Sequence, residues 1–336
     1  MLPLDFMPSE SEIISQIRAR ASQAGRVKVG IGDDAAVIAT QGETDLITCC
    51  DLMVEGVHFR SEWSSPSLIG RKALAVTLSD IAAMGGVARF ALVSLALPEK
   101  TSRDFVDGLF SGLFEMADAC SVSIIGGDTS SSPDSLFIDT VALGECARGR
   151  AVTRRGAKPG DRLFVTGALG ASAFGLSLLE RGARLDRDAG DKLRREALLK
   201  HLAPEPRLAA GRALAEAGIA TSMIDISDGL STDLWHILDE SDCGAVIRAG
   251  QIPLADCLLS PGGGLQEDPL RLAISSGEEY ELLFTARAEH GPRLLDLSGS
   301  LGIRLTEIGE IVAEKSLRID IDGSLEDLKP SGYEHM

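Results

Sequence analysis

The sequence predicts an α/β (α+β) fold in two domains, and three observations support that prediction. The chain has 336 residues, which corresponds to roughly two domains of ~150 residues each. Short β-branched runs alternate with helical patterns through the first half, as in a mixed sheet with helices. The basic, glycine-containing segment 148–161 then precedes a second series of strands and helices. We therefore expect domains at 1–148 and 149–336, the first built on a mixed sheet and the second also α/β.

Apolar periodicity predicts the elements of the first domain. Helices are expected over 10–20, 67–86 and 102–120, and strands over 27–40, 46–51, 90–97, 122–129 and 136–147. Gly85-Gly86 is expected to end the second helix. We expect the strand 46–51 to end at Asp51 and the strand 122–129 to enter a glycine turn.

The second domain is predicted in the same way. Strands are expected at 161–167 and 222–227 and near 243–248, 278–285, 303–312 and 317–321, with helices at about 171–182, 189–202, 206–217 and 228–240. Pro206 suits the first turn of its helix.

Composition excludes several classes of partner. With 33 Lys plus Arg against 50 Asp plus Glu, the net charge is −17, which argues against nucleic acid and anionic membranes. No apolar run reaches ~18 residues, and the first 15 residues lack the features of a secretory signal. The six cysteines form no C-x-x-C pair, so neither a zinc knuckle nor a thioredoxin motif is indicated, and six in 336 residues are too sparse for a disulfide scaffold. We expect a reducing, cytoplasmic location.

Aspartates follow β-like runs or stand at glycine turns at several points of the chain. They are Asp33, Asp34, Asp51, Asp80, Asp128, Asp225 and Asp228. If they converge where strands end, cations are needed, because unpaired carboxylates raise one another's pKa. Oxygen ligands suit Mg²⁺, which commonly completes its shell with substrate phosphates. The pattern therefore favours metal–nucleotide chemistry, since an acidic chain binds polyphosphate through metal ions.

Each aspartate also has a purely local interpretation. Asp beside Gly is a common turn residue, and Asp228 can be a first-turn aspartate of a helix with Ser227 as its N-cap. Other phosphate motifs do not fit: there is no G-x-x-x-x-G-K-[ST], H-R-D or D-F-G. GIGDDA matches G-x-G-x-x-A, but its two aspartates would repel a pyrophosphate.

Other residues near this pattern leave two interpretations open. The segment of Arg154, Arg155 and Lys158 is either a phosphate clamp or a solvated loop. Lys72 can face the same site as Asp80, one or two helical turns away, and Glu278 lies in either a ligand-binding turn or a strand entry.

Two further positions also have an ordinary structural interpretation. His58 is either a ligand or an ordinary surface or core histidine. Cys49-Cys50 read as packing residues, because neighbours in a strand point to opposite faces and cannot both chelate one metal.

Seven motifs, taken in order, resemble thiamine-monophosphate kinase, a family in the superfamily of aminoimidazole ribonucleotide synthetase. They are GIGDDAAVI, CDLMVEGVHF, RKALAVTLSDIAAMGG, IIGGDTS, RAVTRRGAKPGD, IDISDGLSTDL and SGEEYELLF. The resemblance implies a two-domain fold, a homodimer through the N-terminal domain, and Mg²⁺-dependent transfer of the ATP γ-phosphoryl group to thiamine monophosphate. We hypothesise direct in-line transfer without a phosphoenzyme.

The resemblance also assigns residues to roles. The implied metal ligands are Asp34, Cys50, Asp51, Asp80, Asp128, Asp225 and Asp228. Nucleotide contacts fall on Gly127, Asp128, Arg154 and Ser227, and catalytic roles on Asp128, Asp228 and Arg154. Thiamine phosphate is expected at His58, Glu278 and Tyr333.

One departure from the family concerns Cys49-Cys50, where members often carry Ser-Thr. Cys50 can keep a carbonyl contact to a metal ion, but Cys49 supplies no hydroxyl, so one ion is expected to be held differently.

Several relatives of that family stay as alternatives or are disfavoured. Selenophosphate synthetase needs a reactive Cys or selenocysteine near its N-terminus, and residues 1–30 contain no Cys. The hydrogenase-maturation member needs a C-terminal Cys, whereas this chain ends SGYEHM. Aminoimidazole ribonucleotide synthetase and a non-catalytic metal- or thiamine-binding protein remain open.

Overall fold

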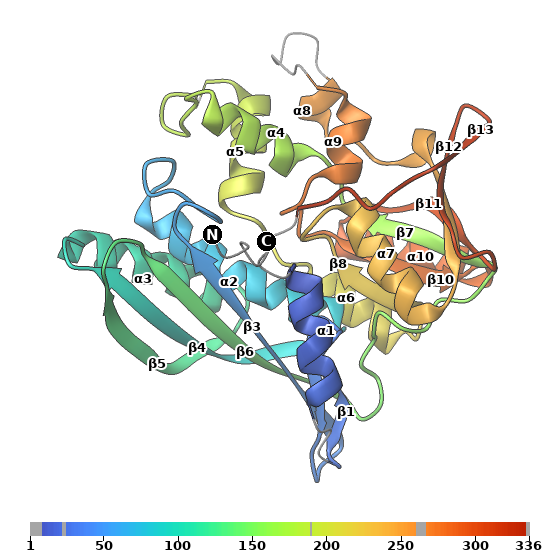
Figure 1. The fold of residues 1–336 in the computed structure, drawn as a ribbon, viewed down its shortest axis with the longest axis horizontal. Coiled ribbons are helices and arrows are strands. Elements are labelled where there is room, and N and C mark those ends of the chain that lie inside the picture. The colour runs from blue at the N-terminus through green and yellow to red at the C-terminus, as the bar shows by residue number, and fades with distance from the viewer. Residues whose placement is uncertain (1–8, 22–24, 189, 260–266, 334–336) are drawn as a thin grey trace, which may run out of the picture.

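The computed structural model describes residues 9–21, 25–188, 190–259 and 267–333, which form two mixed sheets with flanking helices (Figure 1). The expectations for the first eight residues, the closing residues 334–336 and the helix start at 189 concern positions outside these ranges. Among the described residues, no helix is both long and apolar enough to cross a bilayer.

The first sheet has six strands in the order β1-β2-β3-β6-β4-β5. Neighbours are antiparallel except for β4 and β5, which run parallel. The elements are α1 (Glu10–Arg20), β1 (Val27–Val29), β2 (Ala36–Ala39), β3 (Thr44–Val54), α2 (Pro66–Ala83), β4 (Val87–Pro98), α3 (Arg103–Ala119), β5 (Ser123–Ser132) and β6 (Phe137–Ala147). The predicted helices and strands of this half are therefore present.

Helix α2 is the central element of the molecule. Ser65 caps its first turn by accepting a hydrogen bond from the Leu68 amide, and Pro66 follows at the first helical position. Most of its side chains are buried, because α2 packs on the first sheet, on α3 and on α6 of the second half. A helix buried on nearly every side holds its polar residues rigidly, and those residues build the site described below.

The second sheet has seven strands in the order β13-β12-β9-β11-β7-β10-β8. Its elements are β7 (Asp161–Thr166), α4 (Ala171–Glu180), α5 (Lys192–Leu202), α6 (Leu208–Glu216), β8 (Ala220–Asp225), α7 (Leu230–Ser241), β9 (Gly244–Arg248), α8 (Asp256–Leu259), α9 (Pro269–Ser275), β10 (Leu282–Arg287), α10 (Gly291–Leu301), β11 (Leu305–Val312), β12 (Leu317–Ile321) and β13 (Ser324–Asp327). Short 3₁₀ turns lie at Ala249–Gln251 and Ala288–His290.

Several boundaries differ from the sequence-based expectations. Asp51 does not end its strand, because β3 stays paired with β6 as far as Val54. Gly126 and Gly127 are not a turn, because β5 continues through them beside β4 with a register shift. The second half also contains α8, α9, α10 and β13, which the periodicity did not predict.

The segment around Asp228 also differs from the local interpretation. Helix α7 begins at Leu230 with Gly229 at its N-cap, so Ser227 does not cap it and Asp228 precedes it. Both residues therefore lie in the connection that follows β8.

Candidate active site

Three aspartates from distant parts of the sequence converge beside α2. Asp34 lies between β1 and β2, Asp80 in α2 and Asp225 at the end of β8. One carboxylate oxygen from each lies within 4.8 Å of the others. The predicted convergence is therefore confirmed for these three, and it joins both sheets.

Helix α2 supplies hydroxyl groups that hold two of the surrounding carboxylates. The Ser79 hydroxyl donates to Asp225 Oδ2 over 2.5 Å. Asp51, inside β3, accepts a hydrogen bond from Thr77. Because Thr77, Ser79 and Asp80 lie within four consecutive positions of one buried helix, their spacing is set by helix geometry.

Burial makes this cluster unfavourable as a set of charges. Desolvation raises the pKa of Asp225 to about 8 and that of Asp51 to about 6, and the neighbouring carboxylates add to both shifts. The pKa of Asp80 is raised well above its usual value for the same reasons. The Oδ2 atoms of Asp34 and Asp51 are buried without a hydrogen-bond partner. Orphaned carboxylate oxygens of this kind fit a cation.

Arg154 closes one side of the cluster. Its Nη2 lies 2.6 Å from Asp34 Oδ1, and its backbone amide donates to the Asp33 carboxylate over 3.2 Å. Burial, with the neighbouring Asp34 charge, raises the pKa of Asp33 to about 7. Arg155 and Lys158 are exposed, whereas the Arg154 side chain points into the cluster, and its role as a phosphate clamp stays a prediction.

The connection between β8 and α7 is held by a residue that sequence reasoning missed. The Asp233 carboxylate accepts hydrogen bonds from the amides of Asp228, over 3.1 Å, and Gly229, over 3.0 Å. Oxygens of Asp228 and Asp233 and a ring nitrogen of His236 lie within 4.8 Å of one another. The spacing of Asp233 and His236, three positions apart in one helix, was the available signal, because it places both on one face.

Asp128 lies outside the clustered carboxylates. It is exposed in β5 and is paired in register with Ser94 of β4, which is itself paired with Asp139 of β6. Gly127 precedes it with its Cα against the Val93 carbonyl, where an added Cβ would lie 1.7 Å from the oxygen. Cys50 is exposed on β3, two residues before Leu52, which is paired with the same Asp139. The assignments of Gly127, Asp128 and Cys50 stay predictions.

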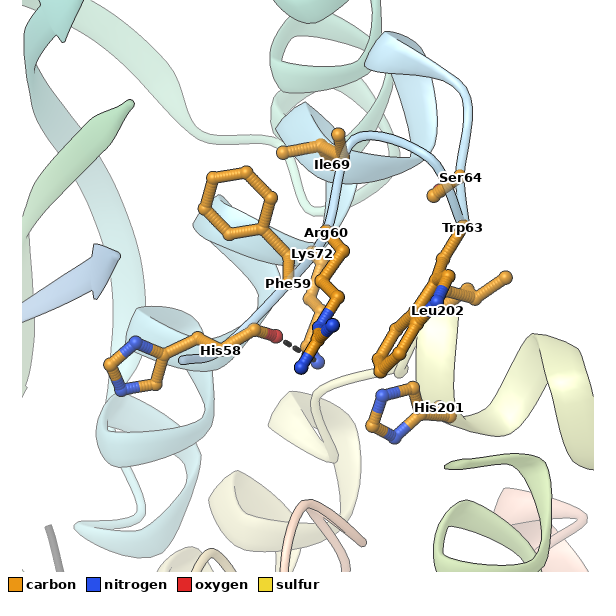
Figure 2. A pocket seen from close by; sticks show the side chains of 9 residues that line it. All are labelled: His58, Phe59, Arg60, Trp63, Ser64, Ile69, Lys72, His201 and Leu202. Atoms are coloured by element: carbon orange, nitrogen blue, oxygen red, sulfur yellow. Dashed lines mark hydrogen bonds between the residues drawn. The ribbon is translucent and has the colours of Figure 1, made fainter. Parts of the chain in front are cut away.

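The residues expected to hold thiamine phosphate lie around the other end of α2. Glu278 pairs with Lys72, whose Nζ lies 2.7 Å from Oε1, and with His201, whose Nδ1 lies 3.1 Å from Oε2. The same Lys72 ammonium group donates to the His58 carbonyl over 3.1 Å (Figure 2). Lys72 therefore faces Glu278 and His58 rather than the aspartate cluster.

A small hollow with aromatic side chains in its wall adjoins this group of residues. Figure 2 shows that its walls come from the segment after β3, from the first turns of α2 and from the end of α5. The Arg60 guanidinium lies 4.9 Å from the centre of the Trp63 ring. The hollow thus has a cationic and an aromatic wall beside the Glu278 pair.

The turn that carries Glu278 contacts the connection that follows Asp225. Its amide donates to the Ser227 carbonyl over 2.7 Å, and a Cβ on Gly277 would lie 2.2 Å from that same oxygen. Glu278 has a φ of 59°, in the left-handed region. Glu278 lies in the turn before β10, which begins only at Leu282, and the binding of a ligand by this turn stays a prediction.

Tyr333 reaches the same place from the C-terminal segment. Its amide donates to the Asp228 carbonyl over 3.0 Å, and its side chain is half exposed. The backbone contacts of Tyr333 and Glu278 therefore fall on Ser227-Asp228, in the connection that directly follows Asp225.

Known proteins similar to the chain were found by sequence and by structure. The family models for AIR synthase related protein match residues 32–146 with the N-terminal domain and 158–322 with the C-terminal domain. The thiamine-monophosphate kinase of Bacillus subtilis (strain 168) is 36% identical over 330 residues, 97% of this chain and 99% of that protein. The one of Escherichia coli (strain K12) is 39% identical over 324 residues, 95% of this chain and 94% of that protein.

Solved structures show the same similarity over the whole chain. The structure of AaThiL complexed with AMPPCP and TMP superposes with a TM-score of 0.84 at 30% identity, covering 98% of this chain and 97% of that one. The thiamine-monophosphate kinase from Stenotrophomonas maltophilia K279a has a TM-score of 0.78 at 35% identity, covering 93% and 96%. The predicted fold class, with two such domains, is confirmed.

Proposed function

The chain belongs to the AIR synthase related proteins and, within them, to the thiamine-monophosphate kinases, and from this premise we propose how its residues carry out the reaction. The reaction transfers the γ-phosphoryl group of ATP to thiamine monophosphate and yields thiamine diphosphate and ADP. The observation that carries the proposal is the buried carboxylate cluster, with its orphaned oxygens, joined to the Glu278 turn at Ser227-Asp228.

Mg²⁺ fits the donor set of the cluster. Hard carboxylate oxygens suit a hard divalent cation, the carboxylates of Asp34, Asp80 and Asp225 converge here, and Asp34 Oδ2 and Asp51 Oδ2 are buried without a hydrogen-bond partner. The residues that would hold it are Asp34, Asp51, Asp80, Asp225 and Asp228, with Asp128 and the Cys50 carbonyl as further proposed ligands. When bound, Mg²⁺ would neutralise charge on the phosphates and on the carboxylates themselves.

The reaction needs no general base from this chain. A phosphate monoester has its second pKa near ~6, so the acceptor is largely dianionic at neutral pH. The difficulty is repulsion between two phosphates, which the Arg154 guanidinium, together with cations held by the carboxylates, would reduce. Arg154 presents the guanidinium, and Ser227, Gly127 and Asp128 contribute nucleotide contacts. This arrangement is consistent with direct in-line transfer.

The Glu278 turn is proposed to hold the thiamine end of the acceptor. The carboxylate offers negative charge to the thiazolium ring, and Tyr333 offers a ring face. His58 is the third residue proposed to hold thiamine phosphate. It lies in the connection after β3, and its carbonyl accepts a hydrogen bond from Lys72, which also pairs with Glu278. The ends of the acceptor are then bound by different residues, with Ser227-Asp228 between them.

The domain roles follow the two sheets, which share no strand. We propose that residues 1–148 bind ATP and Mg²⁺ and form a homodimer, and that 149–336 is the C-terminal domain. The dimer is supported by the first sheet, since α2 and α3 pack on one face while Leu52 and Phe90 are exposed on the other. A reducing cytoplasm agrees with the six free cysteines.

ADP release from purified protein, ATP and Mg²⁺ tests the proposed function. We expect release with thiamine monophosphate, and none above background with free thiamine or without an acceptor. EDTA and Asp225→Asn are expected to abolish it, and Asp128→Asn tests the one proposed ligand outside the cluster. A folded protein that binds ATP but releases no ADP with any acceptor would contradict the kinase assignment. ADP–ATP exchange without acceptor would contradict direct transfer.

A further inference from the structure

Lys72 is a buried amine at the meeting point of the two halves of the chain. Its side chain is 3% exposed, and its ammonium group contacts one residue from each half. Nζ lies 2.7 Å from Glu278 Oε1 and donates to the His58 carbonyl over 3.1 Å. Figure 2 shows this second bond directly, between the end of Lys72 and the main-chain carbonyl oxygen of His58, whose imidazole ring points away from Lys72. One positive group thus connects two of the residues assigned to thiamine phosphate.

The Glu278 carboxylate is held at both oxygens. Oε2 faces His201 Nδ1 at 3.1 Å, and burial lowers the pKa of His201 to about 4, so that this imidazole is neutral near pH 7. Lys72 therefore supplies the positive charge that opposes the burial of the carboxylate. Its charge is the largest effect that lowers the pKa of Glu278.

Backbone geometry determines where the Glu278 side chain begins but does not fix the direction of its carboxylate. The left-handed φ of Glu278 and the bond from its amide to Ser227 set where the side chain starts. A side chain with three rotatable bonds needs a further contact to hold its end in one direction. Lys72 supplies that contact from a helix that is itself buried on nearly every side.

Helix α2 also relates this contact to the acidic cluster. Lys72 and Asp80 are eight positions apart, a rise of about 12 Å along an α-helix. One rigid element thus carries a group for the thiamine end and a group for the phosphate end of the acceptor.

We propose that Lys72 is a positioning residue for thiamine monophosphate, which holds the Glu278 carboxylate and the His58 connection in place across the boundary between the two halves. The inference rests on the proposed function, because it takes Glu278 as a thiamine-phosphate residue. Lys72 itself is not expected to touch the reacting atoms.

Steady-state kinetics of Lys72→Met test the proposal. We expect KM for thiamine monophosphate to rise about tenfold or more, because Glu278 loses its charged partner, and KM for ATP to stay within about twofold. Lys28→Met is the matched control: Lys28 pairs with buried Asp45 at 2.6 Å in the same half, so its loss removes an ion pair without changing either KM. If Lys72→Met does not fold, Lys72→Gln removes the charge and keeps a donor for the His58 carbonyl.

The pH profile separates positioning from a general loss of structure. The charged and titratable groups that face Glu278 are Lys72 of α2, His201 of α5 and His58 of the preceding connection. Without Lys72 the pKa of Glu278 rises, so the ratio of variant to wild-type KM for thiamine monophosphate is expected to fall as the pH is raised. Glu278→Gln in the Lys72→Met background is expected to add little, whereas in the wild type it raises the same KM.

The outcomes distinguish the inference from the function on which it rests. No ADP release by the wild type would contradict the kinase itself, and an unchanged KM for thiamine monophosphate in Glu278→Gln would contradict the assignment of Glu278. If Glu278→Gln raises that KM while Lys72→Met and Lys72→Gln leave it and its pH profile unchanged, the role of Lys72 is overturned alone. Equal increases in both KM values would also overturn it.

Discussion

At the scale of single residues, the site depends on pairs that bring distant charges together. Arg154 bonds to Asp34 through its side chain and to Asp33 through its backbone amide, so one residue both neutralises the acidic cluster and ties the segment after β6 to the first sheet. The neighbouring Arg155 has a similar sequence environment and is exposed. The sequence alone does not show which of the two arginines points into the acidic cluster, because that depends on the backbone conformation at each position.

Arg154→Lys is expected to lower kcat on the order of 10²-fold. Lys cannot reproduce the two-nitrogen contact that Nε and Nη2 make with Asp34 Oδ1, and it offers a point charge instead of a planar fork. Arg155→Lys serves as the control and should leave kcat unchanged. Rates measured at saturating ATP and thiamine monophosphate check this, and equal losses in both variants would contradict the role assigned to Arg154.

At the scale of elements, α2 determines how the two halves of the site are related. It contacts the first sheet, α3 and α6, and it presents Lys72, Thr77, Ser79 and Asp80 to different parts of the site. Its approach to α3 is very close, since an added Cβ on Gly112 of α3 would lie 1.7 Å from the Ser67 carbonyl oxygen. The helix pair therefore depends on the absence of a side chain at Gly112.

Gly112→Ala is expected to lower the melting temperature, with a destabilisation of about 1–3 kcal/mol, because the two helices must move apart. This loss should exceed the ~1 kcal/mol that Ala gains over Gly in a helix. Gly299→Ala in α10, where nothing lies within 4 Å of an added Cβ, should raise the melting temperature instead. Thermal unfolding followed by circular dichroism checks both, and a stabilised Gly112→Ala protein would refute the packing argument.

At the scale of the whole molecule, the acidic cluster makes the stability of the metal-free protein depend on pH. The pKa of Asp33 is raised to about 7 and that of Asp225 to about 8, against roughly 3.9 in an unfolded chain. The native state therefore binds more protons than the unfolded state above pH ~4, and stability falls as pH rises through the native pKa values. His201 and His236, with pKa lowered to about 4, act in the opposite sense only below pH ~6.5.

In EDTA we therefore expect the melting temperature to decrease from pH 7 to 8.5, and Mg²⁺ to reduce that decrease. Asp225→Asn should show a weaker pH dependence, whereas Asp296→Asn, on the exposed surface of α10, should match the wild type. Scanning calorimetry across this range provides the measurement. A melting temperature in EDTA that is constant or increases with pH would show that the cluster does not hold its protons as described.

The face of the first sheet opposite α2 and α3 is the proposed dimer interface of the whole molecule. Phe90, 45% exposed, lies on it, while Leu295 of α10 is 75% exposed elsewhere. If this face forms the homodimer, Phe90→Asp should shift the protein from twice the mass of the 35.4 kDa chain to a single chain, because the interface would bury an unpaired charge. Leu295→Asp should stay dimeric. Light scattering after gel filtration distinguishes these results, and a monomeric wild type would refute the dimer.

The sequence by itself determined the elements, the family and the nature of the chemistry. Local periodicity was sufficient for α2, α3 and most strands, because a helix or strand face is set by neighbours along the chain. It was insufficient for Asp51 and Gly126-Gly127, where pairing with another strand extended β3 and β5 beyond the local signals.

Only the tertiary structure decided which charged residues meet. It brought Asp34, Asp80 and Asp225 together, turned Lys72 toward Glu278, and added Asp233 to the connection that carries Asp228. These contacts join residues up to about two hundred positions apart, so no local pattern encodes them. They arise from the packing of α2 between the two sheets, and burial there is what perturbs the pKa values of the carboxylates.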